Sequence, residues 1–215
     1  MKPRFDLSVY LITDPLLCAG RGLTETARAA VRGGVTIVQL RDKTASDAAL
    51  VSQGQALKKA LAGSGALLIV NDRVEVARAI GADGVHVGQS DAAAADARTA
   101  LGPDAIIGLS VQTTAQAAAL DLALVDYIGV GPVFATTTKP DHAPPLGFEG
   151  LERVCAASAL PAVAIGGLSA EHARAVFAAG ARGLAVVSGI CVAEDPEAAA
   201  RAFADAAREA RRAPS

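Results

Sequence analysis

The sequence lacks an excess of charge of either sign and lacks any long apolar run, and both absences exclude classes of partner. Its 20 basic and 22 acidic residues leave a net charge of −2, so no global basic field exists to hold nucleic acid or an anionic membrane. The longest apolar runs, such as 66–70 and 183–187, are far shorter than the roughly 20 residues of a membrane span. We therefore expect no nucleic acid and no membrane as partners, and any anion site must be local.

Cysteines are few, and their spacing suggests no pairing. Cys18, Cys155 and Cys191 are odd in number and show no CxxC or Cys/His ligand spacing, which argues against a disulfide framework or a zinc site. Residues 1–14 run from a charged start into a β-like segment, without the apolar region and small-residue cleavage site of a signal peptide. These features predict a cytoplasmic protein with reduced thiols.

The chain has a hydrophobic content of 52% over 215 residues, which excludes disorder and is enough for one domain with a substantial core. Short runs rich in Val, Ile and Leu recur, each followed by a polar or glycine-bearing turn and an alanine-rich amphipathic stretch, which is typical of βα units. The predicted strands are Leu7–Thr13, Thr36–Leu40, Leu67–Val70, Gly84–Val87, Ile106–Ser110, Tyr127–Val130, Ala162–Ile165 and Gly183–Val187. The predicted helices lie near 23–33, 46–62, 73–80, 91–101, 113–121, 149–158, 169–179 and 195–212.

Strict alternation of strands and helices favours a (β/α)8 TIM barrel, an α/β fold with a parallel eight-stranded sheet, over an open doubly wound sheet. The barrel would fill residues 1–215 as a single domain. The helix near 195–212 would close it, and residues 211–215 are expected to form a frayed tail. Active sites of such barrels lie at the carboxyl ends of the strands, so the residues that follow each strand become the candidates.

Glycine and serine follow the last two predicted strands, as Gly166-Gly167 and Ser188-Gly189. Close backbone approach and helix N-termini at these two places commonly bind one phosphate in this fold. Double glycines can also serve only to permit tight turns. Together the two pairs predict a site for a phosphate monoester.

A second set of strand ends combines cations with carboxylates. Arg41, Lys43 and Lys139 follow strands two and six, and Asp72 and Asp91 follow strands three and four. Mg²⁺ commonly binds through one or two carboxylates plus substrate phosphates, so the mixture predicts diphosphate chemistry with Mg²⁺. Each residue also has a simpler interpretation, because aspartates cap helices and basic residues form surface ion pairs. None of these five residues alone indicates a site, but their occurrence together does.

The three histidines do not suggest catalysis. His86 alternates with valines and points either into the barrel or toward a helix, where a hydrogen-bonded structural role is expected, and His172 is expected on a helix surface. His142 lies in the irregular stretch 134–147, which has the length of a lid or binding loop. No Ser/His/Asp or Cys/His spacing supports nucleophilic catalysis.

Several of these motifs, in their order along the chain, resemble the thiamine phosphate synthase family. The matching segments, which cover Tyr10 to about Ile190, are Gln39–Lys43, Val70–Asp72, Gly84–Asp91, Gly108–Ser110, Gly129–Lys139, Ala164–Gly167 and Val186–Ser188. The resemblance implies condensation of 4-amino-2-methyl-5-pyrimidinylmethyl diphosphate with a 4-methyl-5-hydroxyethylthiazole phosphate, or its carboxylated form. Diphosphate would be released, with carbon dioxide from the carboxylated thiazole.

The resemblance also implies roles for individual residues. The pyrimidine diphosphate would be bound by Gln39, Leu40, Arg41, Asp42, Lys43, Asn71, Ser110 and Lys139, of which Arg41, Lys43, Ser110 and Lys139 would act in catalysis. The thiazole phosphate would be bound by Thr136, Thr137, Thr138, Gly167, Val187 and Ser188. Asp72 and Asp91 would hold Mg²⁺ as the cofactor. Thr137 stands where many relatives have proline, and His142 where a small residue is common.

Two alternatives accompany this interpretation. The related thiazole tautomerase shares the barrel, but it is expected to use a histidine near the sixth-strand motif, where this chain has Pro132 after Gly131. A noncatalytic sensor of phosphorylated ligands on the same scaffold is the other, because a fold alone does not establish activity. The presence of Asp72, Asp91 and Lys139 together favours the synthase. The sequence leaves the oligomeric state open, because helix faces in one sequence do not identify interface residues.

Overall fold

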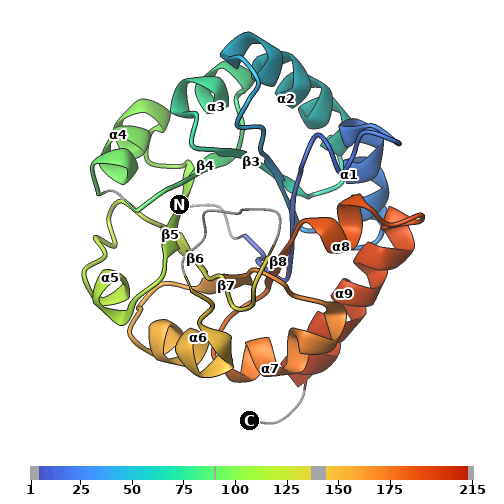
Figure 1. The fold of residues 1–215 in the computed structure, drawn as a ribbon. Coiled ribbons are helices and arrows are strands. Elements are labelled where there is room, and N and C mark those ends of the chain that lie inside the picture. The colour runs from blue at the N-terminus through green and yellow to red at the C-terminus, as the bar shows by residue number, and fades with distance from the viewer. Residues whose placement is uncertain (1–4, 90, 137–143, 213–215) are drawn as a thin grey trace.

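The computed structural model describes residues 5–89, 91–136 and 144–212, and over these residues the chain forms a closed barrel of eight parallel strands in sequence order. The first strand pairs with the last as well as with the second, which excludes an open sheet. Figure 1 looks down this barrel, with its helices forming an outer ring. The strands are β1 (Val9–Ile12), β2 (Ile37–Leu40), β3 (Leu67–Asn71), β4 (Gly84–Val87), β5 (Ile106–Val111), β6 (Tyr127–Val130), β7 (Ala162–Ile165) and β8 (Leu184–Val186).

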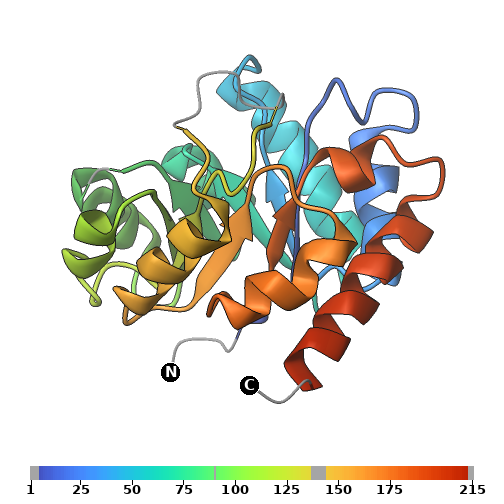
Figure 2. The same cartoon turned by 60° about the horizontal axis from the view of Figure 1, so that its bottom comes forward.

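Helices follow the strands and cover the outside of the barrel, as the side view in Figure 2 also shows. The long last helix packs against α1 and α7 and so closes the ring. The helices are α1 (Leu23–Arg32), α2 (Asp47–Leu61), α3 (Val74–Ile80), α4 (Asp91–Leu101), α5 (Thr114–Ala118), α6 (Gly147–Ala156), the 3-10 turn η1 (Ala170–His172), α7 (Ala173–Ala178), α8 (Ser188–Cys191) and α9 (Pro196–Arg212). Among the described residues, no helix is both long and apolar enough to cross a membrane.

Side chains alternate along each strand between two separate layers of the core. Inward positions such as Tyr10, Ile37 and Tyr127 fill the barrel interior with other buried side chains. Outward positions such as Val38 and Ile128 pack against the helices in a larger layer. Because both faces are buried, the strands are apolar almost throughout, and a polar residue at an inward position marks a place with a specific partner or an opening.

The predicted fold and element order are confirmed, with three local differences. The short helix α8, Ser188–Cys191, was not predicted. Helix α5 ends at Ala118, three residues before the predicted end. The tail predicted to fray from 211 is wrong for its first two residues, because α9 continues to Arg212 and the Arg211 guanidinium donates to Asp6 at 2.6 Å and lies over the Phe177 ring.

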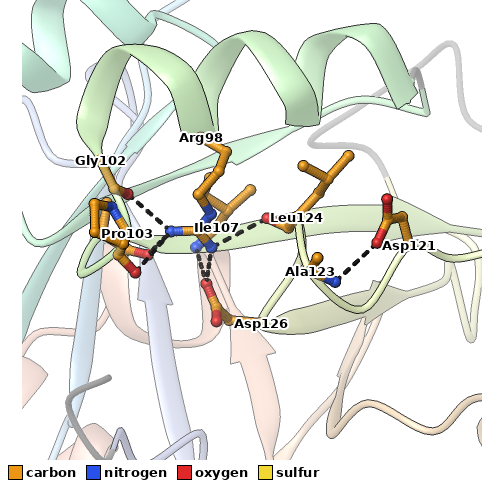
Figure 3. A network of polar contacts seen from close by, with 9 residues as sticks. Arg98, Gly102, Pro103, Ile107, Asp121, Ala123, Leu124 and Asp126 are labelled. Atoms are coloured by element: carbon orange, nitrogen blue, oxygen red, sulfur yellow. Dashed lines mark hydrogen bonds and ion pairs between the residues drawn. The ribbon is translucent and has the colours of Figure 1, made fainter. Parts of the chain in front are cut away.

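A buried ion pair joins Arg98 of α4 to Asp126, the residue before β6 (Figure 3). Arg98 Nη2 donates to Asp126 Oδ2 at 2.7 Å, and both side chains are nearly inaccessible to solvent. The same guanidinium donates to the carbonyl oxygens of four loop residues, Gly102, Pro103, Ala105 and Leu124. The Asp126 carboxylate also accepts the Ile107 backbone N–H. This cluster lies at the amino ends of the strands, away from the end where the polar strand termini gather.

Candidate active site at the carboxyl ends of the strands

A cavity of about 880 Å³ opens at the carboxyl ends of the strands. It is lined by inward-facing residues near strand ends and by residues of the loops that follow them. Both predicted anion sets contribute to this one cavity. The predicted site residues that line it are Gln39, Arg41, Lys43, Asn71, Asp72, Ser110, Thr136, Gly167, Val187 and Ser188.

Two of the predicted residues have other surroundings. Leu40 is fully buried in the layer between barrel and helices, because it occupies an outward position of β2. Asp42 accepts the backbone N–H groups of Thr44 and Ala45 at 2.8 and 3.0 Å, so its carboxylate holds the turn before α2. Thr137, Thr138, Lys139 and the side chain of Asp91 lie outside the described residues.

Asp72 follows β3 in a backbone conformation that non-glycine residues rarely adopt, with φ at +59°. Its backbone N–H donates to the carbonyl oxygen of His86 at 2.9 Å, and its Oδ2 accepts from the Asn71 amide at 2.7 Å. The side chain is exposed and borders the cavity. Strain of this kind persists where surrounding contacts over-determine it and is concentrated at functional sites.

The described residues contain no group of three or more His, Cys, Asp or Glu side chains placed to hold a metal ion. Asp72 is an exposed carboxylate beside the cavity that also receives Arg41 and Lys43, and Glu171 lines the same cavity from η1. Mg²⁺ usually keeps several waters and takes one or two carboxylates plus substrate phosphates. The donor set therefore fits a Mg²⁺ ion that arrives with a phosphorylated substrate rather than one held in an all-protein cage.

The end of β2 is tied to β1 by a pair of hydrogen bonds. Thr13 Oγ1 donates to the carbonyl oxygen of Gln39 at 3.1 Å and accepts the backbone N–H of Arg41 at 3.2 Å. Thr13 is fully buried, so both hydrogen bonds are shielded from water. It fixes the backbone from which the side chains of Gln39 and Arg41 enter the cavity.

The turn after β7 requires glycine at both of its central positions. Gly166 and Gly167 have φ values of +102° and +63°. A Cβ on Gly166 would lie 2.6 Å from the Cβ of Pro132, and one on Gly167 would lie 2.8 Å from the carbonyl oxygen of Ala135. The backbone of this turn therefore lies directly against the segment after β6, and side chains would prevent both the turn and the contact.

Three rings pack at the base of the same turn. The Phe134 and Phe148 rings meet edge to face with centroids 5.1 Å apart, and the His172 ring lies 5.0 Å from Phe134. His172 Nδ1 accepts the backbone N–H of Ser169 at 3.0 Å. His172, which was expected on a helix surface, is the last residue of the 3-10 turn η1, where its half-buried ring also packs against Phe148.

Four residues form a polar chain inside the barrel; Tyr10, His86 and Ser110 line the cavity, and Tyr127 lies in the interior layer of the core. The Tyr10 and Tyr127 hydroxyl oxygens lie 2.8 Å apart, Tyr127 Oη lies 3.0 Å from His86 Nδ1, and His86 Nε2 lies 3.1 Å from Ser110 Oγ. Burial raises the pKa of both tyrosines well above their usual value. Burial lowers the pKa of His86 to about 4, although the charge of Asp72 opposes the shift.

Sequence reasoning left the direction of His86 open and did not single out either tyrosine. All three occupy inward positions: Tyr10 and Tyr127 belong to the interior layer, and His86 lines the cavity with Gln39 and Ser110. The sequence does not reveal these positions, because both faces of the strands are buried and apolar.

The family described as thiamine monophosphate synthase matches residues 9–190 of this chain. The chain belongs to the thiamine monophosphate synthase family. Among its relatives in this family, the thiamine-phosphate synthase of Xanthobacter autotrophicus is 56% identical over 98% of this chain and 100% of its own length. That of a Psychrobacter species is 53% identical over 90% of this chain and 92% of its own. The solved thiamine phosphate pyrophosphorylase of Pyrococcus furiosus superposes with a TM-score of 0.85 at 35% identity, over 95% of this chain and 96% of its own.

Proposed function

We propose that this chain is a thiamine phosphate synthase that transfers a pyrimidinylmethyl group from its diphosphate to the ring nitrogen of a thiazole phosphate. The C–O bond to the diphosphate breaks, diphosphate leaves with the electron pair, and the thiazole nitrogen lone pair forms the new C–N bond. With a carboxylated thiazole, carbon dioxide is lost as well. Membership in the family and full-length similarity to thiamine-phosphate synthases support this activity.

The observation that carries the proposal is that one cavity receives two separated sets of anion-handling groups. Arg41, Lys43 and Asp72 enter it from the ends of β2 and β3, and Gly167 and Ser188 from the ends of β7 and β8. A diphosphate at the first set and a phosphate monoester at the second would bring two phosphorylated substrates together over one barrel. Holding two reactants in line converts a bimolecular step into one that is effectively unimolecular.

The first set would act on the leaving diphosphate. Arg41 and Lys43 would bind its oxygens and stabilise the charge that develops as the C–O bond breaks. Asp72 and Asp91 would hold Mg²⁺, and the chemistry that the bound ion supplies is neutralisation of diphosphate charge. Lys139 would add a further positive charge, and Gln39, Asn71 and Ser110 would orient the pyrimidine diphosphate by hydrogen bonds.

The second set would fix the thiazole phosphate. Gly166 and Gly167 form a turn without side chains in which Gly167 is exposed, so its backbone N–H would bind a phosphate oxygen and Ser188 would supply a hydroxyl. Thr136, Thr137, Thr138 and Val187 would complete this half of the site. The pyrimidine amino group can stabilise a benzyl-like cation, so a dissociative displacement requires no protein nucleophile, in agreement with a cavity rich in cations and amides.

The experiment mixes the purified chain with the pyrimidine diphosphate, the thiazole phosphate and Mg²⁺, and follows thiamine phosphate and diphosphate by chromatography. Equal amounts of both products, lost on addition of EDTA, are expected. Lys43→Gln should lower the rate strongly, whereas Lys59→Gln, which removes an exposed charge on α2, should not. Binding of the substrates without products would make the chain a sensor, and isomerisation of a carboxythiazole phosphate alone would make it a tautomerase.

A further inference from the structure

The polar chain of Tyr10, Tyr127, His86 and Ser110 continues to a second residue of the proposed site. Gln39 Nε2 donates to the Tyr10 hydroxyl at 2.7 Å, and from Tyr10 the chain runs through Tyr127 and His86 to Ser110. Gln39 and Ser110 both line the cavity. Two substrate-facing residues on different strands are therefore linked through the barrel interior by three residues to which no role has been given.

Two strand glycines make room for this chain. A Cβ on Gly108 would lie 2.4 Å from both His86 Nδ1 and the Tyr127 hydroxyl oxygen, and a Cβ on Gly129 would lie 2.9 Å from His86 Cε1. Glycine weakens a strand interior, and its presence there often marks a close approach of other groups. The His86 ring and its bond to Tyr127 thus occupy space that any other residue at 108 would fill.

The direction of each hydrogen bond in this polar chain follows from which atoms carry a proton. Gln39 donates to the Tyr10 oxygen, and a phenol has a single proton, which Tyr10 then directs to the Tyr127 oxygen. Tyr127 in turn directs its proton to His86 Nδ1. A neutral imidazole that accepts at Nδ1 carries its own proton on Nε2 and donates it to Ser110 Oγ.

The opposite direction leaves a buried group unsatisfied. If His86 carried its proton on Nδ1, that proton would go to Tyr127 and the Tyr127 proton to Tyr10, whose own proton would then face the Gln39 amide nitrogen, which is a donor and not an acceptor. A protonated ring would place a charge between two neutral hydroxyl groups. Buried donors without partners are rare and costly, so the first direction is favoured.

We propose that Tyr127 is a positioning residue that acts through His86 to make Ser110 a hydrogen-bond donor toward the bound pyrimidine diphosphate. Ser110 accepts from His86 Nε2–H, so its hydroxyl proton is available for an acceptor atom of the substrate in the cavity. Tyr10 secures the direction by coupling Tyr127 to Gln39. The identity of the substrate rests on the proposed function, whereas the protonation pattern does not.

The first test is independent of turnover. Nitrogen-15 NMR of the full chain, labelled at histidine, reports which ring nitrogen of His86 is protonated, and a His86→Gln sample identifies the signals. We expect a protonated Nε2 and an unprotonated Nδ1 near neutral pH. A proton on Nδ1 would reverse the direction of the hydrogen bonds from Tyr127 to Ser110 and overturn the proposal. This outcome does not depend on whether any variant folds.

The second test is a double-mutant cycle measured on thiamine phosphate formation. Tyr127→Phe keeps the ring and should lower kcat about tenfold, the effect of losing one hydrogen bond to the reacting system. In a Ser110→Ala background the same change should have no further effect, because Tyr127 acts only through Ser110. Losses that multiply would overturn the proposal.

Ile106→Val is the matched control for this cycle, because it removes one methylene from the same interior layer without touching the chain of hydrogen bonds. Its kcat should stay at the wild-type value. If the wild-type protein forms no product, the proposed function fails. The NMR result still decides the direction of the hydrogen bonds among Tyr127, His86 and Ser110.

Discussion

The Asn71 amide donates a hydrogen bond of 2.7 Å to the Asp72 carboxylate, so the residue that ends β3 orients the first residue of the loop. This contact holds Asp72 beside the cavity in a left-handed conformation. An amide that satisfies one carboxylate oxygen leaves the other free for a cation. Asn71 and Asp72 together thus supply an oriented carboxylate oxygen at the proposed Mg²⁺ site.

Replacing Asp72 by Asn tests this arrangement, because asparagine tolerates the same backbone conformation and removes only the charge. We expect Mg²⁺-dependent turnover to fall by about 100-fold or more, with an unchanged melting temperature, because the charge on the diphosphate would lose its main counterpart. Steady-state rates over a Mg²⁺ titration measure the effect. Asp104→Asn, in the exposed loop before β5, is the control. Equal rates in both variants would remove Asp72 from the metal site.

The ion pair of Arg98 with Asp126 predicts a loss of stability that is separate from activity. Arg98→Ala leaves a buried carboxylate without its counter-charge and four carbonyl oxygens without a donor. Breaking such a pair typically costs about 3–5 kcal/mol in the free energy of unfolding. Urea denaturation measures the change, while kcat at low temperature should be retained.

Arg28→Ala provides the comparison, since its pair with Glu25 on α1 is exposed and should be worth about 1 kcal/mol or less. Similar losses in the two variants would show that burial does not set the strength of the Arg98 cluster.

Parts of the site could be predicted because the carboxyl ends of parallel strands converge. Gln39, Asn71 and Ser110 lie at or next to the ends of strands whose apolar runs were clear, so the barrel alone predicted that they meet. The contact between Tyr10 and Tyr127 could not be predicted, because the two lie 117 residues apart in sequence and only the closed barrel brings them together.

Two further features lacked a usable pattern in the sequence. The orientation of His86 was undecided because the valines on both sides of it are buried and give no sign of which face is the interior. Helix α8 is four residues long, less than the length at which helical periodicity can be recognised.

Gly108 predicts a strict size limit inside the barrel. A Cβ at this position would lie 2.2 Å from Tyr127 Cζ, so Gly108→Ala must displace the tyrosine or the His86 ring. We expect a loss of about 1–3 kcal/mol in the free energy of unfolding, as for overpacked cores, together with lower kcat. Gly20→Ala, which meets nothing within 4 Å, should leave both quantities near wild type. A fully active, equally stable Gly108→Ala protein would contradict the predicted steric clash with Tyr127 and His86.

The lowered pKa of His86, about 4 in the folded protein against a usual value of 6.5, predicts how stability depends on pH. Between these two values the unfolded chain binds a proton that the folded protein does not, so the free energy of unfolding falls as pH decreases from 6.5 to 4 and this contribution is constant above 6.5. One pKa unit corresponds to about 1.4 kcal/mol, so the difference between 6.5 and about 4 sets an upper value of about 3 kcal/mol for this contribution.

Urea denaturation in EDTA at pH 7, 6, 5 and 4.5 measures this dependence. His86→Gln should have a lower stability at pH 7, since Gln cannot reproduce both ring contacts, but a smaller decline toward pH 4.5 than the wild type, since the titrating group is gone. The two curves should therefore converge on acidification. Parallel curves would mean that His86 binds its proton over the same pH range in the folded and the unfolded protein, and the prediction that burial lowers its pKa would then be wrong.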